Sequence, residues 1–525
     1  MTSSGSTGFD VMQGHPRRWP ILGVMVFSLL VVVLDNSVLN VALRSIQQEL
    51  QASQSQLEWA VNSYTLVFAG LLFTWGVLGD RYGRRLILVI GMISFGITSA
   101  LCAHAATANQ LIGYRALMGV AGASVLPVTL AIVTNVFPPA ERGRAIGVWA
   151  GSTGLGVALG PIVGGLLLEH FWWGSVFLIN VPIAIVAVVA VLVLVPESKD
   201  AHPSKIDPLG VLLSLVGVIT LVFGIIRGGN LNDWWNIQVI GPIVLGIVLL
   251  AIFALFERRS SHPSLDVTLF RDARFSASTA AITLAFFALF GAVFFLSFYL
   301  QYVKDYSPLQ AGLRLIPTAL GLVIFAPLSE RGVRLWGARF VVAVGLCIVA
   351  LSFFGNQLIE VETPYWHLAI LQAMLGMGMG LTVAPATTSF MSALPRDKAG
   401  TGSAVTNAFR QIGGALGVAI LGSVIASVYR TNISSSLSSL PPELQKTAGE
   451  SLGSTLQVVG AAPELENPDL IVNTALHAYV DALHAGTLVA AVAALCGAAV
   501  AFKWLPKKGA NPVPEAGVSH GADFA

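Results

Sequence analysis

A single acidic residue lies deep inside the first long apolar segment of the chain. Asp35 belongs to the run 34–43, and a rise of about 1.5 Å per residue places it roughly 22 Å along a helix that starts at Pro20. A charged side chain near the middle of a membrane costs about 2.5–3.5 kcal/mol, so it is expected to face a cavity or a partner. A carboxyl group there can take up a proton on one side and release it on the other. The alternative is a structural carboxylate that bonds neighbouring helices.

Arg115 is the expected partner of Asp35. It lies near the start of the fourth apolar segment, which the orientation derived below places in the same outer half of the membrane as Asp35. A guanidinium group stays protonated, so it would stabilise the ionised carboxyl and be released when Asp35 takes up a proton. A structural Arg115 that bonds backbone carbonyls is the alternative. Arg410 is a third charge within an apolar segment, and both a structural and a substrate-binding role fit its position.

Charges and glycines are dense between the second and third apolar segments, where residues 76–85 read GVLGDRYGRR. The residues of interest are Gly76, Asp80, Arg81, Gly83, Arg84 and Arg85. Because long apolar runs flank this stretch, it is expected to form a tight loop at a membrane surface. An acid at a helix end can accept backbone N–H groups or pair with an arginine. We expect the loop to clamp helix ends, the alternative being that its positive charge only marks the inner side.

The fifth apolar segment carries a glycine-rich face. Its residues of interest are Gly156, Gly160, Pro161, Gly164 and Gly165. Glycines four positions apart lie on one helix face and allow close approach of a neighbouring backbone. A proline within a membrane helix bends it and frees a carbonyl group. We expect this helix to pack tightly across the interface of two halves, although close packing without a switching role gives the same spacing.

The composition excludes a soluble globular chain. Of the 525 residues, 55% are hydrophobic and 11% are charged, whereas soluble domains carry about 25% charged residues. The net charge of +2 and the lack of a basic tract argue against nucleic-acid binding. The three cysteines all lie in apolar segments, so we expect no disulfide and no metal site. The chain has no Gly-Lys dipeptide and therefore no P-loop, which argues against an ATP-driven pump.

Fourteen stretches reach the length of about 20 mostly apolar residues that a spanning helix needs. They are roughly 19–43, 57–78, 86–105, 110–137, 145–168, 175–195, 208–226, 237–256, 275–303, 309–328, 338–354, 366–394, 401–429 and 485–505. With the N-terminus inside, most of the 29 Lys and Arg residues fall in inner segments. The positive-inside rule then places both termini in the cytoplasm.

The second half of the chain repeats features of the first, as in transporters with duplicated halves. Gly119 and Pro127 have counterparts in Gly376 and Pro385, while neutral Gln372 stands where the first half has its buried arginine. The expected parts are a tail 1–18, a six-helix bundle 19–200, an inserted helix pair 201–260, helices nine to thirteen in 261–430, an extracytoplasmic loop 431–484, a last helix 485–505 and a tail 506–525. We expect the long loop to be a solvated hairpin, with a lid over the outward opening as the alternative.

Together these motifs resemble the major facilitator superfamily, and within it the fourteen-helix drug:proton antiporter branch of the EmrB/QacA type. The 76–85 loop matches motif A, the 156–165 glycines match motif C, and residues 34–43 match the first-helix motif with Ser37 in place of Thr and Arg44 in place of Pro. Leu111, Arg115 and Gly119 match motif B, with Met118 in place of its usual Gln. The resemblance implies an all-α membrane fold of two six-helix bundles plus two extra helices, which alternate access to a central cavity.

The resemblance and the buried charges predict proton-driven export of an amphipathic drug-like compound by a non-enzymatic transporter of the prokaryotic plasma membrane. The residues expected to line the substrate cavity are Asn36, Asn40, Trp59, Asn62, Tyr64 and Arg410. With Asp35 as the one acid deep in the membrane, we expect monocations or neutral molecules rather than dications. A dedicated exporter of one antibiotic, metabolite or lipid-like compound is the alternative. Expected partners are a lipophilic small molecule, protons and membrane lipids; we expect a monomer without metal, nucleic acid or any cofactor beyond the proton gradient.

Overall fold

The computed structural model describes residues 14–200, 207–231, 233–260, 267–393, 399–438, 440–461 and 467–506. Every regular element in these ranges is helical, which confirms the expected all-α architecture. Thirteen helical segments within them are long and apolar enough to cross a membrane. The 32-residue helix α6, Pro139–His170, stands where the fifth span was expected. The total of fourteen spans stays a prediction, and most of each expected terminal tail lies outside the described residues.

The N-terminal half consists of eight helices. They are α1 (Arg18–Leu50), α2 (Gln54–Tyr82), α3 (Arg84–Ala103), α4 (Ala108–Gly122), α5 (Val125–Val136), α6 (Pro139–His170), α7 (Ser175–Leu178) and α8 (Asn180–Leu194). Two long helices follow, α9 (Pro208–Leu231) and α10 (Ile237–Glu257). They correspond to the expected inserted pair.

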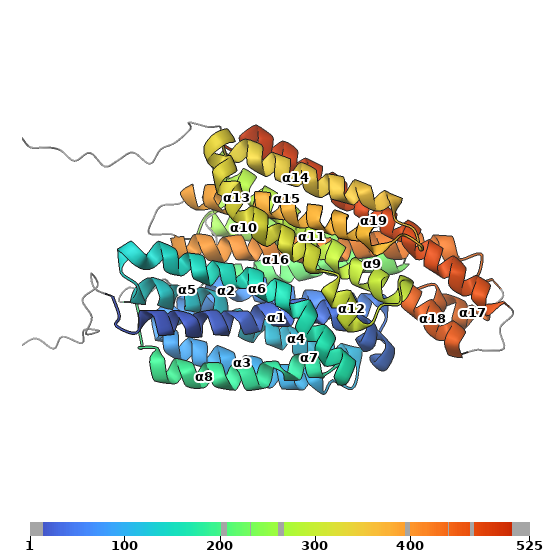
Figure 1. Ribbon diagram of the computed structural model, residues 1–525, viewed down its shortest axis with the longest axis horizontal. Helices are drawn as coiled ribbons and strands as arrows, with labels where there is room; N and C mark the ends of the chain where they lie inside the picture. The colour runs from blue at the N-terminus through green and yellow to red at the C-terminus, as the bar shows by residue number, and fades with distance from the viewer. Residues whose placement is uncertain are drawn as a thin grey trace, which may run out of the picture.

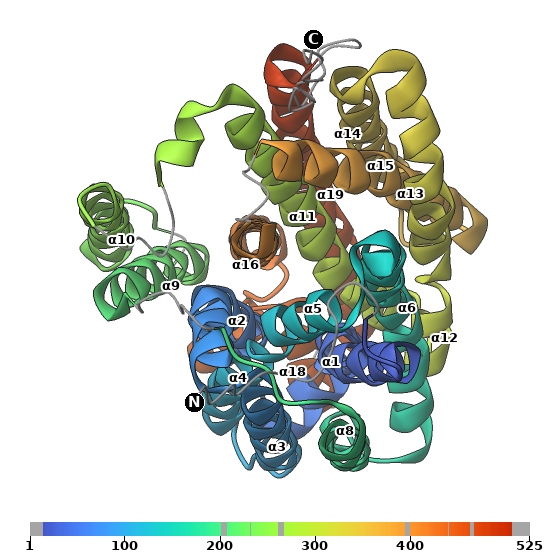
Figure 2. The same cartoon turned by 90° about the vertical axis from the view of Figure 1, so that its left-hand side faces the viewer.

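The C-terminal half holds the remaining helices. They are η1 (Val267–Arg271), α11 (Ala273–Phe298), η2 (Tyr299–Val303), α12 (Pro308–Leu313), α13 (Ile316–Trp336), α14 (Ala338–Gly355), η3 (Asn356–Leu358), α15 (Tyr365–Ser392), α16 (Ala399–Ile433), α17 (Pro442–Ala448), α18 (Leu452–Ala461) and α19 (Pro468–Trp504). In Figure 2 these helices form a group beside the N-terminal helices. Helix α9 lies to one side against α2 and α16, and α10 packs on the outer side of α9.

Proline positions explain why three spans are each divided into two helices. Proline has no backbone N–H, so the carbonyl group four residues before it loses its helical partner. Helix α7 ends at Leu178, four residues before Pro182, and α12 ends at Leu313, four residues before Pro317. The break between α4 and α5 falls in the same way at Ala123, four residues before Pro127.

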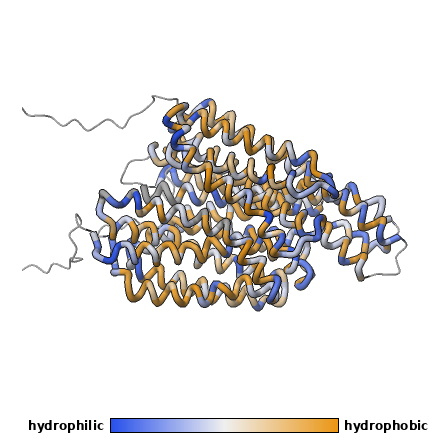
Figure 3. The backbone as a smooth tube through the Cα atoms, viewed as in Figure 1, coloured by the Kyte–Doolittle hydropathy of each residue, from blue (hydrophilic) through white to orange (hydrophobic). Residues whose placement is uncertain are grey.

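The helices run along the long axis of the molecule in Figure 1, and the two ends of the bundle differ. The start of α1 and the end of α19 lie at one end, here called the terminal end, whereas α17 and α18 lie at the other, here called the hairpin end. Hydrophobic residues dominate the middle of the bundle and hydrophilic ones gather toward both ends, as Figure 3 shows. This banding fits a bilayer-spanning bundle, and the assignment of the terminal end to the cytoplasm stays a prediction from the charge pattern.

The duplicated halves seen in the sequence pack in equivalent ways. A side chain on Gly119 of α4 would meet the Tyr64 backbone of α2, and one on Gly376 of α15 would meet the Thr318 backbone of α13. The two glycines therefore serve the same close helix crossing in their respective halves.

Residues 431–484 differ from the expected solvated hairpin. Within the described part of this stretch, α16 continues to Ile433, α17 and α18 form two short helices, and α19 begins at Pro468 rather than near Ala485. Helix α18 buries Leu452, Thr455 and Val458, because its apolar face packs onto the bundle. The sequence therefore predicted the C-terminal part of α19, whereas the helix itself begins 17 residues earlier, at Pro468.

Candidate functional site

A buried ion pair lies in the N-terminal half. Asp35 of α1 is 2% exposed and Arg115 of α4 is 0% exposed. The Nη1 atom of Arg115 donates a hydrogen bond of 2.6 Å to Oδ2 of Asp35. The expected pairing of these two charges is therefore present. Because both side chains are removed from solvent, neither group exchanges protons with water in this conformation.

The second carboxylate oxygen of Asp35 is also held. The side-chain amide of Asn180, the first residue of α8, donates to Oδ1 at 2.9 Å and to the Ser99 hydroxyl at 3.0 Å. The Ser99 hydroxyl in turn donates to the Phe177 carbonyl at 2.8 Å. Neither Asn180 nor Ser99 was predicted from the sequence, because nothing in their spacing relates them to Asp35.

Arg115 makes further contacts to α2. Its Nε atom donates to the Ala60 carbonyl at 3.1 Å, and its guanidinium carbon lies 4.2 Å from the centre of the Tyr64 ring. Its Nη2 atom and the Tyr64 hydroxyl have no hydrogen-bond partner. Arg115 thus has alternative contacts on α2 that remain if its bond to Asp35 is lost.

The expected cavity residues fall into different environments. Asn36 and Asn40 on α1 are partly exposed, and the Asn40 carbonyl accepts a 2.6 Å hydrogen bond from Ser297 of α11. Asn62 is fully buried, with neither side-chain polar atom paired. Tyr64 is also fully buried and stacks on Phe68, 5.5 Å between ring centres, so it packs within the N-terminal half rather than lining an open cavity.

The other two expected cavity residues, Trp59 and Arg410, each have an aromatic ring of another helix as a neighbour. The Trp59 ring lies 6.3 Å from the Phe223 ring of α9, so it packs against the inserted pair. The guanidinium carbon of Arg410 on α16 lies 4.3 Å from the centre of the Phe286 ring on α11. Arg410 also donates a weak 3.4 Å bond to the Asn407 side chain. Both of these contacts are with residues of the C-terminal half.

A second buried acid was missed by the sequence reasoning. Glu58 of α2 is 3% exposed and lies one helical turn before Asn62. It stands close to the start of α2, where hydropathy alone does not separate a membrane-surface acid from a buried one. Glu58 is thus buried within the protein. That Asp35 is the one acid deep in the membrane, and that dications are therefore poor substrates, stay predictions.

The glycine face of α6 contacts both halves. A side chain on Gly156 would come within 2.6 Å of Val33, and one on Gly160 or Gly164 would meet Ser37 or Val38, all on α1. The Ser37 hydroxyl donates to the Gly156 carbonyl at 3.1 Å.

The last glycine of this motif faces the C-terminal half. A side chain on Gly165 would lie 2.5 Å from the Leu309 Cα on α12, and Gly312 of α12 lies equally tightly against the carbonyl of Pro161. Helix α6 is therefore the packing element between the halves that its sequence predicted.

Hydrogen bonds that join the halves gather at the hairpin end. Arg44 donates to the Gln301 carbonyl and Gln301 donates to the Val41 carbonyl at 3.1 Å. Gln47 accepts from the Tyr302 hydroxyl at 3.0 Å and donates to the Ser451 hydroxyl at 3.2 Å. These bonds hold the last turns of α1 against α11, η2 and α18, so the hairpin end is closed.

The 76–85 loop clamps the terminal end of the N-terminal half. Asp80 accepts two hydrogen bonds from Arg84, at 2.9 and 2.8 Å. The carboxylate of Glu197, in the segment after α8, accepts the backbone N–H groups of Arg85 and Leu86 at 3.0 and 3.2 Å. It thereby caps α3 and pairs with the Arg85 side chain at 3.9 Å. Two other residues of the loop make different contacts. The Arg81 guanidinium lies over the Tyr82 ring, and a Cβ on Gly76 would lie 3.5 Å from the Pro127 side chain.

Gly83 is expected to be intolerant of a side chain. Its φ of +123° is a conformation that L-residues rarely adopt, and a Cβ there would lie 2.8 Å from the Glu197 carboxylate. Such backbone strain costs of order 1–3 kcal/mol, so Gly83→Ala should lower the thermal unfolding temperature of the purified protein. Gly113→Ala, where a Cβ has open space, is the matched control. Equal unfolding temperatures for both variants and the parent would contradict this account.

Comparison with known proteins adds a family to this geometry. The sequence model described as Major Facilitator Superfamily matches residues 25–418. The multidrug efflux pump LfrA of Mycolicibacterium smegmatis is 35% identical over 485 residues, which cover 92% of this chain and 95% of that protein. The tetracenomycin C resistance and export protein of Streptomyces glaucescens is 32% identical over 412 residues, 78% of this chain and 76% of that protein.

Solved structures agree in fold. A bacterial homologue of the human lysosomal transporter Spinster, in an inward-facing and unoccupied conformation, superposes with a TM-score of 0.64 at 18% identity. The match covers 93% of this chain and 96% of that one. At this identity the likeness concerns the fold alone.

Proposed function

Because the chain belongs to the Major Facilitator Superfamily, we propose that it exports amphipathic drug-like compounds by alternating access, in exchange for protons. The chain is a transporter rather than an enzyme, and it is a multi-pass protein of the prokaryotic plasma membrane. We further propose that it works as a monomer among membrane lipids, with the proton gradient as its energy source and no cofactor.

The observation that carries proton coupling is the occluded pair of Asp35 and Arg115. The carboxylate is held on both oxygens, by Arg115 and by Asn180. When a proton reaches Asp35, the neutral carboxyl no longer balances the guanidinium charge, and the ion pair weakens. Arg115 keeps its contacts to the Ala60 carbonyl and the Tyr64 ring. Protonation therefore changes how α4 and α2 are held to α1.

The change at Asp35 lies on the helix that also seals the hairpin end. The C-terminal part of α1, at the hairpin end, carries Arg44 and Gln47, whose hydrogen bonds join the halves. A movement of α1 relative to α2 and α4 thus bears directly on these bonds. In this scheme substrate enters from the cytoplasm while the hairpin end is closed. Proton uptake from the outside then accompanies release after the hairpin end opens.

A dedicated exporter of one compound is the second candidate function. The relative from Streptomyces glaucescens is named for resistance to and export of a single antibiotic, tetracenomycin C, whereas LfrA is named a multidrug efflux pump. The two candidates share the same coupling chemistry and differ in how many compounds the cavity accepts.

Transport by proteoliposomes tests both proposals. Purified protein would be reconstituted and given an imposed pH gradient, with a panel containing ethidium, a neutral lipophilic dye and an aromatic polyketide. Gradient-dependent movement of several compounds supports multidrug export, and movement of one supports the dedicated exporter. Movement that persists unchanged when a protonophore collapses the gradient would overturn proton coupling.

A further inference from the structure

Arg410 is a positive charge within an apolar span that no acid compensates. It lies on α16, in the span Val405–Ile433, and among the described residues no Asp or Glu forms an ion pair with it within 4.0 Å. Arg115, by contrast, is paired with Asp35. A charged side chain within a membrane costs about 2.5–3.5 kcal/mol at the centre of a helix, and such residues mark cavities and substrate paths.

Most of the hydrogen-bonding capacity of Arg410 is unused. A guanidinium group carries five N–H donors in one plane. The side-chain hydrogen bond of Arg410 in the described part of the chain is the 3.4 Å bond from Nη1 to Oδ1 of Asn407. No nitrogen of the group is both enclosed and unpaired, and the side chain is partly exposed. The remaining donors therefore face open space, and their planar arrangement matches the two oxygens of a carboxylate.

The helix that carries Arg410 lies inside the bundle. Helix α16 packs against α2, α9, α11 and α19 and also contacts α5, and Figure 2 shows it near the centre of the molecule. Its partly exposed side chains therefore face spaces between helices rather than lipid. Because α2 and α5 belong to the N-terminal half and α11 to the C-terminal half, α16 lies at the boundary of the two halves, where substrate sites of such transporters are found.

Two phenylalanines of α11 form an aromatic wall beside the guanidinium group. The guanidinium carbon of Arg410 lies 4.3 Å from the centre of the Phe286 ring. Phe286 meets Phe290 edge to face, at 5.6 Å between ring centres. Gly414, one turn after Arg410, makes room for this wall, because a Cβ there would collide with the Phe290 ring. A positive charge and an aromatic surface are thus adjacent within the bundle.

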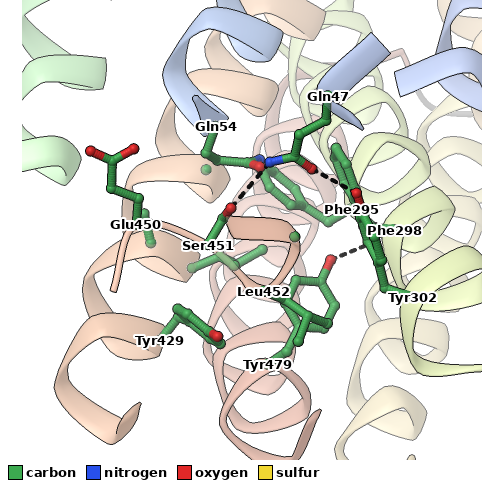
Figure 4. A pocket seen from close by; sticks show the side chains of 14 residues that line it. Gln47, Gln54, Phe295, Phe298, Tyr302, Tyr429, Glu450, Ser451, Leu452 and Tyr479 are labelled. Atoms are coloured by element: carbon green, nitrogen blue, oxygen red, sulfur yellow. Dashed lines mark hydrogen bonds between the residues drawn. The ribbon is translucent and has the colours of Figure 1, made fainter. Parts of the chain in front are cut away.

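Arg410 lies far from the closed hairpin end. Tyr429, further along α16, lines the pocket beneath α18, and Figure 4 shows that pocket with Gln47 bonded to Tyr302 and Ser451. At a rise of about 1.5 Å per residue, Arg410 is roughly 28 Å from Tyr429 along the helix. While the hairpin end is closed, a ligand therefore has to reach Arg410 from the terminal end.

We propose that Arg410 and the wall of Phe286 and Phe290 bind the carboxylate and the ring system of aromatic acids and zwitterions that enter as cargo. The inference rests on the proposed export function and names a substrate class for it, one that the charge of Asp35 does not indicate. The guanidinium group holds the two carboxylate oxygens, and the phenylalanine rings contact the aromatic body. The charge of Arg410 is then compensated only while cargo is bound.

Binding of naphthoate to the purified full-length protein in lipid nanodiscs tests the site without any gradient. Naphthylmethanol and naphthylmethylammonium carry the same rings with no charge and with a positive charge. The parent should bind naphthoate most tightly of the three. Arg410→Gln should weaken naphthoate binding about tenfold or more, because charge-assisted hydrogen bonds are lost, and should leave naphthylmethanol binding nearly unchanged.

Arg339→Gln is the matched control for this experiment. The guanidinium carbon of Arg339 also lies over a phenylalanine, 4.1 Å from the centre of the Phe502 ring, but it stands at the start of α14 against α19. This variant should bind all three probes as the parent does. Arg410→Lys guards against a folding defect in Arg410→Gln. It keeps the charge without the planar donors, so it should bind naphthoate less tightly than the parent but still prefer it to naphthylmethanol.

Three results would each overturn the inference: equal affinity of the parent for the three probes, unchanged naphthoate binding in Arg410→Gln, or an equal loss in Arg339→Gln. If Arg410→Gln does not fold, Arg410→Lys decides, and a folded lysine variant without preference for naphthoate would overturn the inference as well. Naphthoate that binds through Arg410 but is not moved by a pH gradient in proteoliposomes would instead contradict the proposed export function.

Discussion

Proteoliposomes containing Asp35→Asn should show gradient-driven ethidium export at the level of protein-free vesicles. Arg115 and Asn180 donate to different oxygens of Asp35, so the single amide oxygen of asparagine can replace only one of these acceptors. The amide also neither carries the balancing charge nor exchanges a proton. Export and the pH gradient would therefore be uncoupled. The measurement is the rate of ethidium movement with and without an imposed pH gradient.

The same substitution should also destabilise the protein. Removing one member of a buried ion pair leaves the other charge uncompensated, which costs about 3–5 kcal/mol. Arg115 is 0% exposed, so this cost applies to its guanidinium in full. Thermal unfolding of the purified variant must therefore be measured beside transport. Asp35→Glu, which keeps a proton-exchanging carboxyl group, should recover part of both properties.

Asp305→Asn is the matched control for this experiment. Asp305 is also an acid paired with an arginine, at 3.4 Å from Arg44, but its side chain is 86% exposed. Exposed pairs contribute little, so transport and unfolding temperature should stay near those of the parent. Coupled export that survives in Asp35→Asn would remove Asp35 from the coupling mechanism, whatever the control does.

The pairing of Asp35 with Arg115 was predictable because an apolar segment offers a charged side chain few partners. Two opposite charges at a similar depth in long apolar runs have few other ways to be satisfied. Their supporting residues were not predictable. Asn180 and Ser99 are ordinary polar residues at helix positions with no periodic signal. Asn180 reaches Asp35 through the packing of α8 against α1, and Ser99 reaches Asn180 through the packing of α3 against α8.

The sequence likewise predicted that residues 76–85 form a clamp, but it did not predict which residue outside the loop they bond. Charge density and glycines indicated a tight, bonded loop. Its main acceptor, Glu197, comes from a segment 112 residues away from Arg85 along the chain. Nothing local marks it, because a lone acid after a membrane helix most often faces solvent.

Hydropathy predicted where the apolar parts of the helices lie, but not where each helix begins and ends. It placed the last helix near 485–505, whereas α19 starts at Pro468. It also gave no sign that Glu58 is buried, since that residue stands four positions after the start of α2. The Glu58 carboxylate lies against Gly422 of α16, a residue of the second half of the chain, and hydropathy carries no information on such a contact.

A side chain at Gly165 should stop the hairpin end from closing. In this closed conformation a Cβ on Gly165 would lie 2.5 Å from the Leu309 Cα and 2.9 Å from the Leu309 nitrogen. These are backbone atoms of α12 in the opposite half, so they cannot yield by a rotamer change. Gly165→Val would therefore disfavour the closed hairpin end and shift the population toward the open one. Export should fall to background, because alternating access needs both states.

The shift can be read directly from accessibility. In a background without the native Cys102, Cys347 and Cys496, a cysteine would be placed at Ser451, which is buried beneath the hairpin beside Gln47. A membrane-impermeant maleimide applied from outside should label it about tenfold faster in Gly165→Val, as expected for a change of about 1.4 kcal/mol between the two states.

Gly151→Val provides the control on the same helix, because a Cβ at Gly151 has open space around it. It tests whether a valine in α6 disturbs the helix itself. We expect parental labelling and parental export for Gly151→Val. If Gly165→Val also labelled and transported like the parent, the contact of α6 with α12 would be plain packing, and the glycine face would have no part in switching. If both variants lost export without faster labelling, the helix rather than the closed state would be the sensitive element.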